Sequence, residues 1–126
     1  MIDREPERAA SLSAAMSVLF PNATVNVGQD VEQAMHRVAG LIHATSTGMD
    51  THLGMPLPAD LLRPELWVSE IVYFPLETEL LRQAHLRGCR TLSGGGMAVF
   101  QAVEAFRLFT GRNADAGACL LISRKQ

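Results

Sequence analysis

Along most of its length, the chain alternates short apolar stretches of strand character with stretches whose apolar residues recur at helical spacing. This alternation is typical of βαβ units, in which helices connect neighbouring parallel strands. It predicts an α/β fold with a parallel sheet. The expected helices lie at 6–19, 31–38, 76–86 and 97–110, and the expected strands at 23–27, 40–45, 66–73 and 89–92.

Several residues at the expected boundaries agree with this pattern. Pro6 suits a first helical turn, where its missing N–H would be unpaired in any case, and Asp30 is a suitable cap for the next helix. Gly88 and Gly111 stand where helices commonly end. Residues 46–58 form a loop longer than an ordinary strand–helix connection, and such loops are often functional.

Charge and composition exclude several classes of function. A net charge of −2 leaves no basic field that would attract nucleic acid or an anionic membrane surface. No stretch approaches the roughly 18 apolar residues of a membrane span, and the charged N-terminus is unlike a secretory signal, so we expect a cytoplasmic protein. Neither the histidines nor Cys89 and Cys119 have the spacing of a metal site, and Cys89 is expected to be buried.

Ligands of open α/β sheets bind outside the carboxyl ends of the strands, so the residues that follow each strand are the first candidates. Asp3 and Arg4 come directly after an expected strand end at Met1 and Ile2. In a dinucleotide-binding fold, an acidic residue there binds the adenosine ribose, whereas a neighbouring arginine suits the 2′-phosphate of NADP. Asp3 therefore favours NAD, while Arg4 keeps NADP open. The alternative is that Asp3 only caps the helix.

The next two strand ends also carry polar residues. Thr45, Ser46 and Gly48 offer hydroxyl groups and close backbone approach to ribose or phosphate, although they could equally do no more than shape a turn. Tyr73 follows an apolar strand, and its hydroxyl needs a partner if the ring is buried. A core tyrosine with a satisfied hydroxyl is the more frequent case at such a position.

Three consecutive glycines, residues 94–96, stand at the start of the last long helix. Backbone N–H groups and the positive end of the helix dipole at such a start suit a cofactor or an anion. Gln101 follows on the same helix, with both a donor and an acceptor for a polyol. Glycines also mark tight turns, so this motif alone is a weak signal.

Four motifs in this order resemble a known family: DREPERA, HATSTGM, IVYFPLETELL and GGGMAVFQAVEAFRLFTG. Together they resemble the nucleotide-binding domain of shikimate dehydrogenases, and more closely the quinate/shikimate dehydrogenase branch. The resemblance implies an incomplete Rossmann-like, doubly wound parallel sheet. It predicts a partial dinucleotide-binding domain at 1–112, followed by a divergent tail at 113–126. Within the tail, residues 118–122 are apolar enough for one helical turn or a short strand, and the sequence leaves the choice open.

The resemblance also implies an activity, namely reversible hydride transfer between NAD or NADP and shikimate or quinate. It assigns no metal and no catalytic residue to this chain, and it leaves open whether the ring is shikimate or quinate. The implied cofactor contacts are Asp3, Arg4, Thr45, Ser46, Gly48, Ile71, Gly94 and Met97, and the implied substrate contacts are Tyr73 and Gln101.

The chain departs from the family pattern at three polar positions. His43 stands where the resemblance leads us to expect Asn, and Glu70 and Ser93 stand where it leads us to expect Asp. We interpret each as an exchange that weakens local hydrogen bonding without abolishing the fold.

A larger departure is that the 126 residues contain neither the glycine-rich GxGGxG turn nor the catalytic Lys/Asp pair of the family. The first strand of the sheet, which is central in the order 3-2-1-4-5-6, is missing as well. We therefore expect a truncated chain that is poorly stable or associates through exposed sheet edges, with little or no dehydrogenase activity. The alternative is a non-catalytic nucleotide-binding or interaction module.

Overall fold

The computed structural model describes residues 1–123, so the last three residues of the predicted tail lie outside the described residues. The chain divides into two compact units, Met1–Val38 and Ala39–Gln126.

The first unit contains two helices. Helix α1 spans Pro6–Leu19, as predicted, with Pro6 in its first turn. Helix α2 spans Val31–Met35, and the side chain of its cap Asp30 accepts a hydrogen bond from the N–H of Gln33 at 3.0 Å. Helix α2 is shorter than predicted because the chain tightens at its end, where the N–H of Arg37 bonds to the carbonyl of Ala34 at 3.0 Å.

The strand predicted at 23–27 is wrong, because these residues form no ladder in the structure. The Met1 backbone pairs with this segment through two bonds, from the Met1 amino group to the Asn26 carbonyl at 2.7 Å and from the Gly28 N–H to the Met1 carbonyl at 2.9 Å. The hydroxyl of Ser13 on α1 adds a third bond, to the carbonyl of Val25 at 3.0 Å. A β-strand is defined by a repeated ladder with a partner strand, and pairing with one residue does not supply it.

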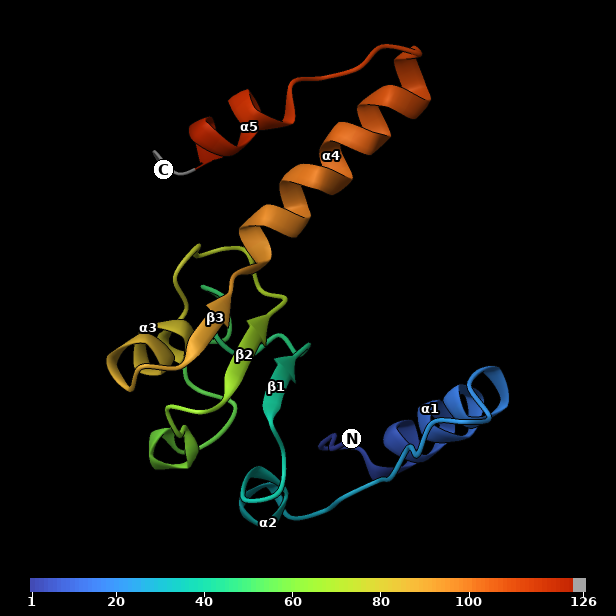
Figure 1. The fold of residues 1–126 in the computed structure, drawn as a ribbon, viewed down its shortest axis with the longest axis vertical. Coiled ribbons are helices and arrows are strands. Elements are labelled where there is room, and N and C mark those ends of the chain that lie inside the picture. The colour runs from blue at the N-terminus through green and yellow to red at the C-terminus, as the bar shows by residue number, and fades with distance from the viewer. Residues whose placement is uncertain (124–126) are drawn as a thin grey trace. The chain divides into compact units, whose positions relative to one another are not determined.

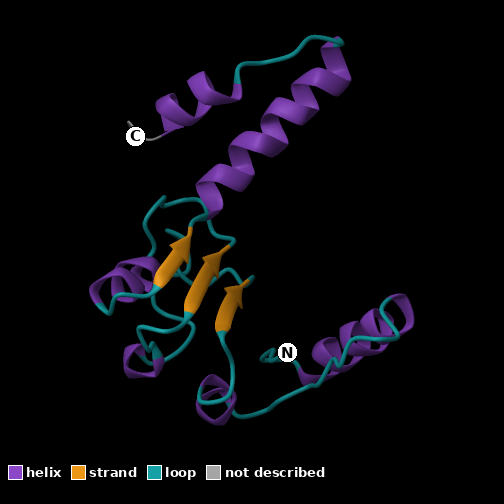
Figure 2. Ribbon diagram, viewed as in Figure 1, coloured by secondary structure: helices purple, strands orange, loops and turns teal. Residues whose placement is uncertain are grey.

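A three-stranded sheet is the centre of the second unit. Strands β1 (Gly40–His43), β2 (Trp67–Glu70) and β3 (Arg90–Leu92) are hydrogen-bonded in the order β1-β2-β3, and both pairs are parallel. Figure 2 shows the three strands as orange arrows that point the same way, towards the start of the long helix. The predicted α/β fold with a parallel sheet is confirmed.

Strands β1 and β2 end earlier than predicted, at His43 and Glu70. After Glu70 the chain leaves the ladder within two residues, because the N–H of Val72 bonds to the Glu70 side chain at 3.0 Å. Between β1 and β2 lies the long loop, followed by a short 3₁₀ turn, η1 (Ala59–Leu61).

The remaining helices also differ from prediction at their ends. Helix α3 spans Glu79–Leu86 and starts three residues late, because Thr78 caps it by accepting a hydrogen bond from the N–H of Leu81 at 3.3 Å. Helix α4 spans Gly94–Thr110, so the three glycines form its first turn, and Gly111 ends it with a φ of 68°.

The tail from residue 113 onwards contributes a further helix, α5, which spans Ala116–Ser123 and packs against α4 (Figure 1). The carboxylate of Asp115 accepts a hydrogen bond from the N–H of Ala118 at 3.0 Å at the start of α5.

The core of the second unit lies between the sheet and α3. Leu80, Leu81 and Ala84 on α3 are buried, as are Leu66 and Val68 on the β2 side. The opposite face of the sheet carries Ile42, Trp67 and Leu92, all exposed. A shallow depression follows this second face, lined mainly by Ile42, Trp67, Ser69, Arg90 and Leu92.

Candidate functional site

The carboxyl ends of the three parallel strands meet at one edge of the sheet, and three loops converge there. The N–H of Ile71, directly after β2, bonds to the carbonyl of His43 at the end of β1 at 3.0 Å. Gly94, at the start of α4, lies so close to the chain after β2 that a Cβ on it would stand 2.5 Å from the Ile71 carbonyl oxygen and 2.7 Å from that of Val72. The sequence prediction that these segments form one region is supported for the second unit.

The loop after β1 exposes the hydroxyl residues that were singled out from the sequence. Thr45 and Ser46 are both exposed, and Gly48 is buried with a φ of 94°, a backbone conformation that favours glycine. The N–H of Gly48 bonds to the carbonyl of His52 at 2.7 Å, which closes the loop on itself. The loop therefore presents Thr45 and Ser46 from a defined backbone position.

Beneath these loops lies a buried polar cluster that sequence reasoning did not predict. The Glu70 side chain is fully buried, and its two carboxylate oxygens receive three partners. Oε1 accepts from the N–H of Val72 at 3.0 Å and contacts His43 Nδ1 at 2.9 Å, while Oε2 accepts from the hydroxyl of Thr78 at 3.0 Å. Such a carboxylate is fully satisfied inside the protein, as buried charged groups need to be.

His43 extends this cluster to the loop after β1. Its side chain is 3% exposed, and its Nε2 lies 2.6 Å from the hydroxyl oxygen of Thr45. A neutral imidazole with its proton on Nδ1 satisfies both contacts, because Nδ1–H then donates to Glu70 and Nε2 accepts from Thr45. In that tautomer the Thr45 hydroxyl donates inwards, and its oxygen is left as an acceptor that faces the N–H of Thr47 at 3.3 Å.

This cluster corrects the interpretation of two departures from the family pattern. His43 and Glu70 are register partners on neighbouring strands, and they bond to each other. The two exchanges therefore do not weaken local hydrogen bonding, since the imidazole and the longer carboxylate complement one another. The available signal was that both unusual residues end adjacent strands. At the third position, Ser93 precedes α4 and makes no side-chain capping bond.

Four more of the predicted contacts lie near this strand edge or on α4. Tyr73 is 55% exposed, so the alternative of a core tyrosine is wrong, and Ile71 is 38% exposed beside it in the chain. Met97 is half-buried and Gln101 is exposed, both on α4. In the first turn of α4 the glycines carry no side chain over their N–H groups, and no side chain caps them. These groups are suitable donors for a polar ligand.

Asp3 and Arg4 belong to the first unit, so the structure does not bring them together with the residues above. The Asp3 carboxylate accepts a hydrogen bond from the N–H of Glu5 at 2.8 Å and lies 3.9 Å from the guanidinium of Arg8. This bond goes to the N–H of the cap residue Glu5, and α1 has no side-chain capping bond, so Asp3 makes a local contact just before the helix without capping it. Its predicted role in binding ribose stays a prediction.

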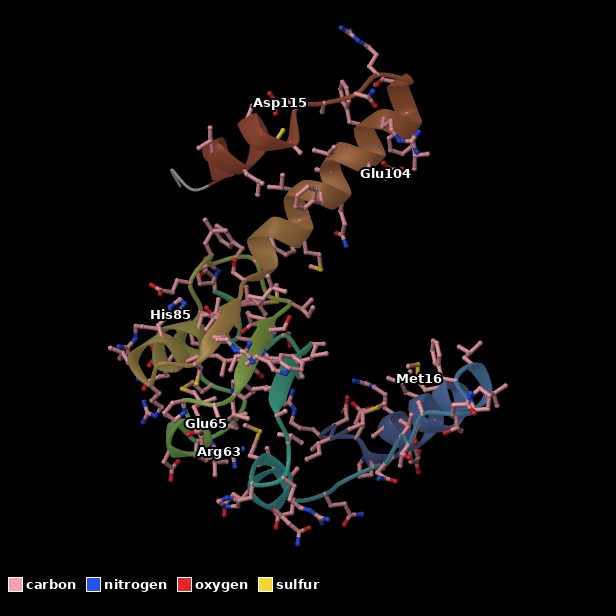
Figure 3. All side chains as sticks on the ribbon, viewed as in Figure 1. Met16, Arg63, Glu65, His85, Glu104 and Asp115 are labelled. Carbon is pink, nitrogen blue, oxygen red and sulfur yellow. The ribbon has the colours of Figure 1, made fainter. Side chains whose placement is uncertain are left out.

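Within residues 1–123, no group of three or more His, Cys, Asp or Glu side chains could hold a metal ion. The His–Glu pair at the surface of α3 is separate from the buried cluster. His85, labelled in Figure 3, contacts Glu77 at 3.2 Å through Nδ1 and the Thr91 hydroxyl at 2.6 Å through Nε2.

Among the helices of the described residues, none is both long and apolar enough to cross a membrane.

Comparison with known proteins agrees with this geometry. Residues 94–120 match the model of the shikimate 5'-dehydrogenase C-terminal domain. The chain is 54% identical over 118 residues to shikimate dehydrogenase (NADP(+)) of Streptomyces avermitilis, an alignment with 92% of this chain and 40% of that protein. It is 42% identical over 115 residues to quinate/shikimate dehydrogenase (NAD(+)) of Corynebacterium efficiens, covering 90% of this chain and 40% of that protein. Over most of its length the chain is therefore similar to shikimate and quinate dehydrogenases.

Solved structures of shikimate and quinate dehydrogenases are similar to this chain over nearly its whole length. Quinate dehydrogenase from Corynebacterium glutamicum in complex with NAD has a TM-score of 0.88 at 34% identity, over 99% of this chain and 45% of that one. Shikimate 5-dehydrogenase from Thermus thermophilus in complex with NADP(H) and shikimate has a TM-score of 0.79 at 30% identity, over 98% and 44%. The fold is Rossmann-like, and the chain spans about two fifths of the length of the curated relatives it matches.

Proposed function

We propose that this chain is the nucleotide-binding part of a dehydrogenase that transfers hydride between NAD or NADP and shikimate or quinate. The observation that carries the proposal is the strand edge, where the loop after β1, the segment after β2 and the start of α4 converge. Open α/β sheets bind their ligands at this edge. The full activity requires groups that these 126 residues do not contain, and we propose that the chain alone turns over little or no substrate.

The residues at the edge fit a dinucleotide. Thr45, Ser46 and Gly48 would contact the ribose and phosphate part, and the N–H groups of the first turn of α4, which no side chain caps, would add donors. Ile71, Gly94 and Met97 would lie against the nicotinamide, where apolar and small residues admit a flat ring. The bound dinucleotide would supply the hydride acceptor or donor, and the chain would hold and orient it.

Asp3 and Arg4 would meet the adenosine ribose. Because Asp3 favours a free 2′-hydroxyl, we propose NAD as the preferred cofactor and NADP as the second choice. The relatives include proteins named for each cofactor, so this preference depends on Asp3 and Arg4 alone.

Tyr73 and Gln101 would contact the cyclic polyol acid. The Tyr73 ring is exposed at the strand edge, so its hydroxyl is available to a carboxylate, and the exposed Gln101 amide can both donate to and accept from ring hydroxyls. We further propose that the protein acts in the cytoplasm. Association through the sheet edges stays a prediction.

Isothermal titration of the chain with NAD and with NADP tests the proposal. We expect binding of at least one dinucleotide, tighter for NAD, and no measurable oxidation of shikimate or quinate in a coupled absorbance assay. Asp3→Asn should reduce the preference for NAD, and Glu7→Gln, which changes an acidic residue nearby on α1, is the matched control. Absence of binding to either dinucleotide would overturn the proposed function.

A further inference from the structure

The buried cluster around Glu70 connects the two loops that carry most of the proposed site. The Glu70 carboxylate accepts a hydrogen bond from the N–H of Val72, in the segment that bears Ile71 and Tyr73. Another contact goes to His43, whose second nitrogen bonds to Thr45 in the loop after β1. The exposed candidate residues that follow β1 and those that follow β2 are therefore connected through one buried side chain, that of Glu70.

The third partner of Glu70 connects the same group to α3. The Thr78 hydroxyl donates to Glu70 Oε2 at 3.0 Å and accepts from the N–H of Leu81 at 3.3 Å, so it caps the helix and bonds to the carboxylate at once. Thr78 also borders the loop after β1, because a Cβ on Gly48 would lie 3.5 Å from the Thr78 Cβ. Helix α3 thereby gives Glu70 a fixed position relative to both loops.

We propose that Glu70 and His43 are positioning residues of the nucleotide site, which hold the loop after β1 and the segment after β2 in one arrangement. The inference rests on the proposed function. Neither residue touches the ligand, since the Glu70 side chain is fully buried and that of His43 is 3% exposed. Their effect on the ligand passes through Thr45 on one side and Val72 on the other.

Core packing alone does not explain a carboxylate at position 70. A residue that served only to fill the core would be apolar at this depth, because a buried carboxylate is costly unless every oxygen is paired. Here all the pairing goes to groups at the strand edge or to the cap of α3. No buried side-chain nitrogen or oxygen among the described residues lacks a partner, so the cluster is complete without further groups.

The test uses the full chain and two readouts, amide hydrogen exchange without ligand and titration with NAD and NADP. Glu70→Gln leaves one acceptor oxygen where there were two. His43→Leu removes the imidazole contacts to Glu70 and Thr45 but leaves the bond between Glu70 and the Val72 N–H. We expect Glu70→Gln to speed exchange of both the Gly48 and Val72 amides by about tenfold, since a hydrogen bond to a charged group is worth about 1.5–3 kcal/mol. His43→Leu should affect Gly48 but not Val72.

Two controls separate positioning from loss of stability. Glu77→Gln makes the same chemical change in the exposed Glu77–His85 pair and should change neither loop. The amide of Arg90, which bonds to the Leu66 carbonyl at the opposite end of the strands, should keep its exchange rate in all variants. Equal acceleration at Arg90 would show a merely structural role and overturn the proposal.

The titration then connects the loops to the ligand. Glu70→Gln should weaken dinucleotide binding by about tenfold, and unchanged binding with faster loop exchange would overturn the positioning role. If the unsubstituted chain binds neither dinucleotide, the proposed function fails, and the exchange data alone decide whether Glu70 holds the two loops together. In that case faster exchange at both Gly48 and Val72 supports the connection, and unchanged exchange at both refutes it.

Discussion

Gly94 gives the sharpest test of how the strand edge is built. It is the first residue of α4 and has no left-handed backbone, so alanine meets no conformational objection there. The cost of Gly94→Ala comes from space alone. The new Cβ would stand 2.5 Å and 2.7 Å from two carbonyl oxygens of the chain after β2, and backbone atoms cannot rotate away as a flexible side chain can.

The magnitude follows from two opposing effects. Alanine improves an exposed helical position over glycine by about 0.5–1 kcal/mol, whereas forcing an extra carbon into a packed site costs about 1–3 kcal/mol. Gly96→Ala is the matched control on the same turn, because nothing lies within 4 Å of its Cβ position. We expect Gly96→Ala to be neutral or stabilising. Gly94→Ala should be less stable than this control by about 1–3 kcal/mol, because the gain in helix propensity is common to both variants.

Urea denaturation followed by circular dichroism measures the difference. Gly95→Ala supplies an intermediate case, because its Cβ would meet a methyl group of Leu76 at 2.9 Å, and that side chain can move. The expected order of stability is Gly96→Ala, then Gly95→Ala, then Gly94→Ala. Equal stability of the Gly94→Ala and Gly96→Ala variants would refute the close approach between α4 and the segment after β2.

Three further predictions concern other parts of the chain. A hydrogen bond from Arg82 lowers the pKa of Glu79 from 4.5 to about 2. The pair therefore stabilises the chain above pH 4.5, and its contribution is lost as the pH falls towards 2. Glu79→Gln should flatten the acid limb of a pH-dependent unfolding curve by a small amount, because the pair is exposed. Burial raises the pKa of the Cys89 thiol, so a thiol reagent at pH 8 should modify Cys119 first, and equal rates in mass spectrometry would contradict this. Asp30→Ala removes the cap of α2 and should cost about 1 kcal/mol in thermal unfolding, whereas Asp60→Ala should have little effect since no side-chain capping bond is made at η1.

The period of the apolar residues was sufficient to predict α1, α3, α4 and the parallel strands, because packing on one face imposes that period. The ends of elements were predicted less well. The Thr78 side chain sets the start of α3 by capping it, and β2 ends where the Glu70 side chain accepts a hydrogen bond from the Val72 N–H. Side-chain bonds of this kind are formed in the folded chain and are not visible in the period of the apolar residues. For the same reason the strand expected at 23–27 failed, since strand propensity cannot supply a partner.

The sequence likewise predicted the exposed part of the candidate site but not its buried part. Exposed residues after each strand could be identified because the geometry of parallel sheets puts them at one edge, and the family resemblance gave them roles. The Glu70 cluster could not be found from motifs, because His43 and Glu70 are 27 positions apart and become neighbours only through the register of β1 and β2. An unusual residue at each of two adjacent strand ends was the available clue.

The face of the sheet opposite α3 has a practical consequence, because the single tryptophan of the chain lies on it. Trp67 is 38% exposed, and its indole occupies the space next to Gly40 that any side chain at residue 40 would need. Indole emission shifts to shorter wavelength when water is removed from the ring. The chain therefore carries its own optical probe, able to report without a label when another segment or molecule covers that surface.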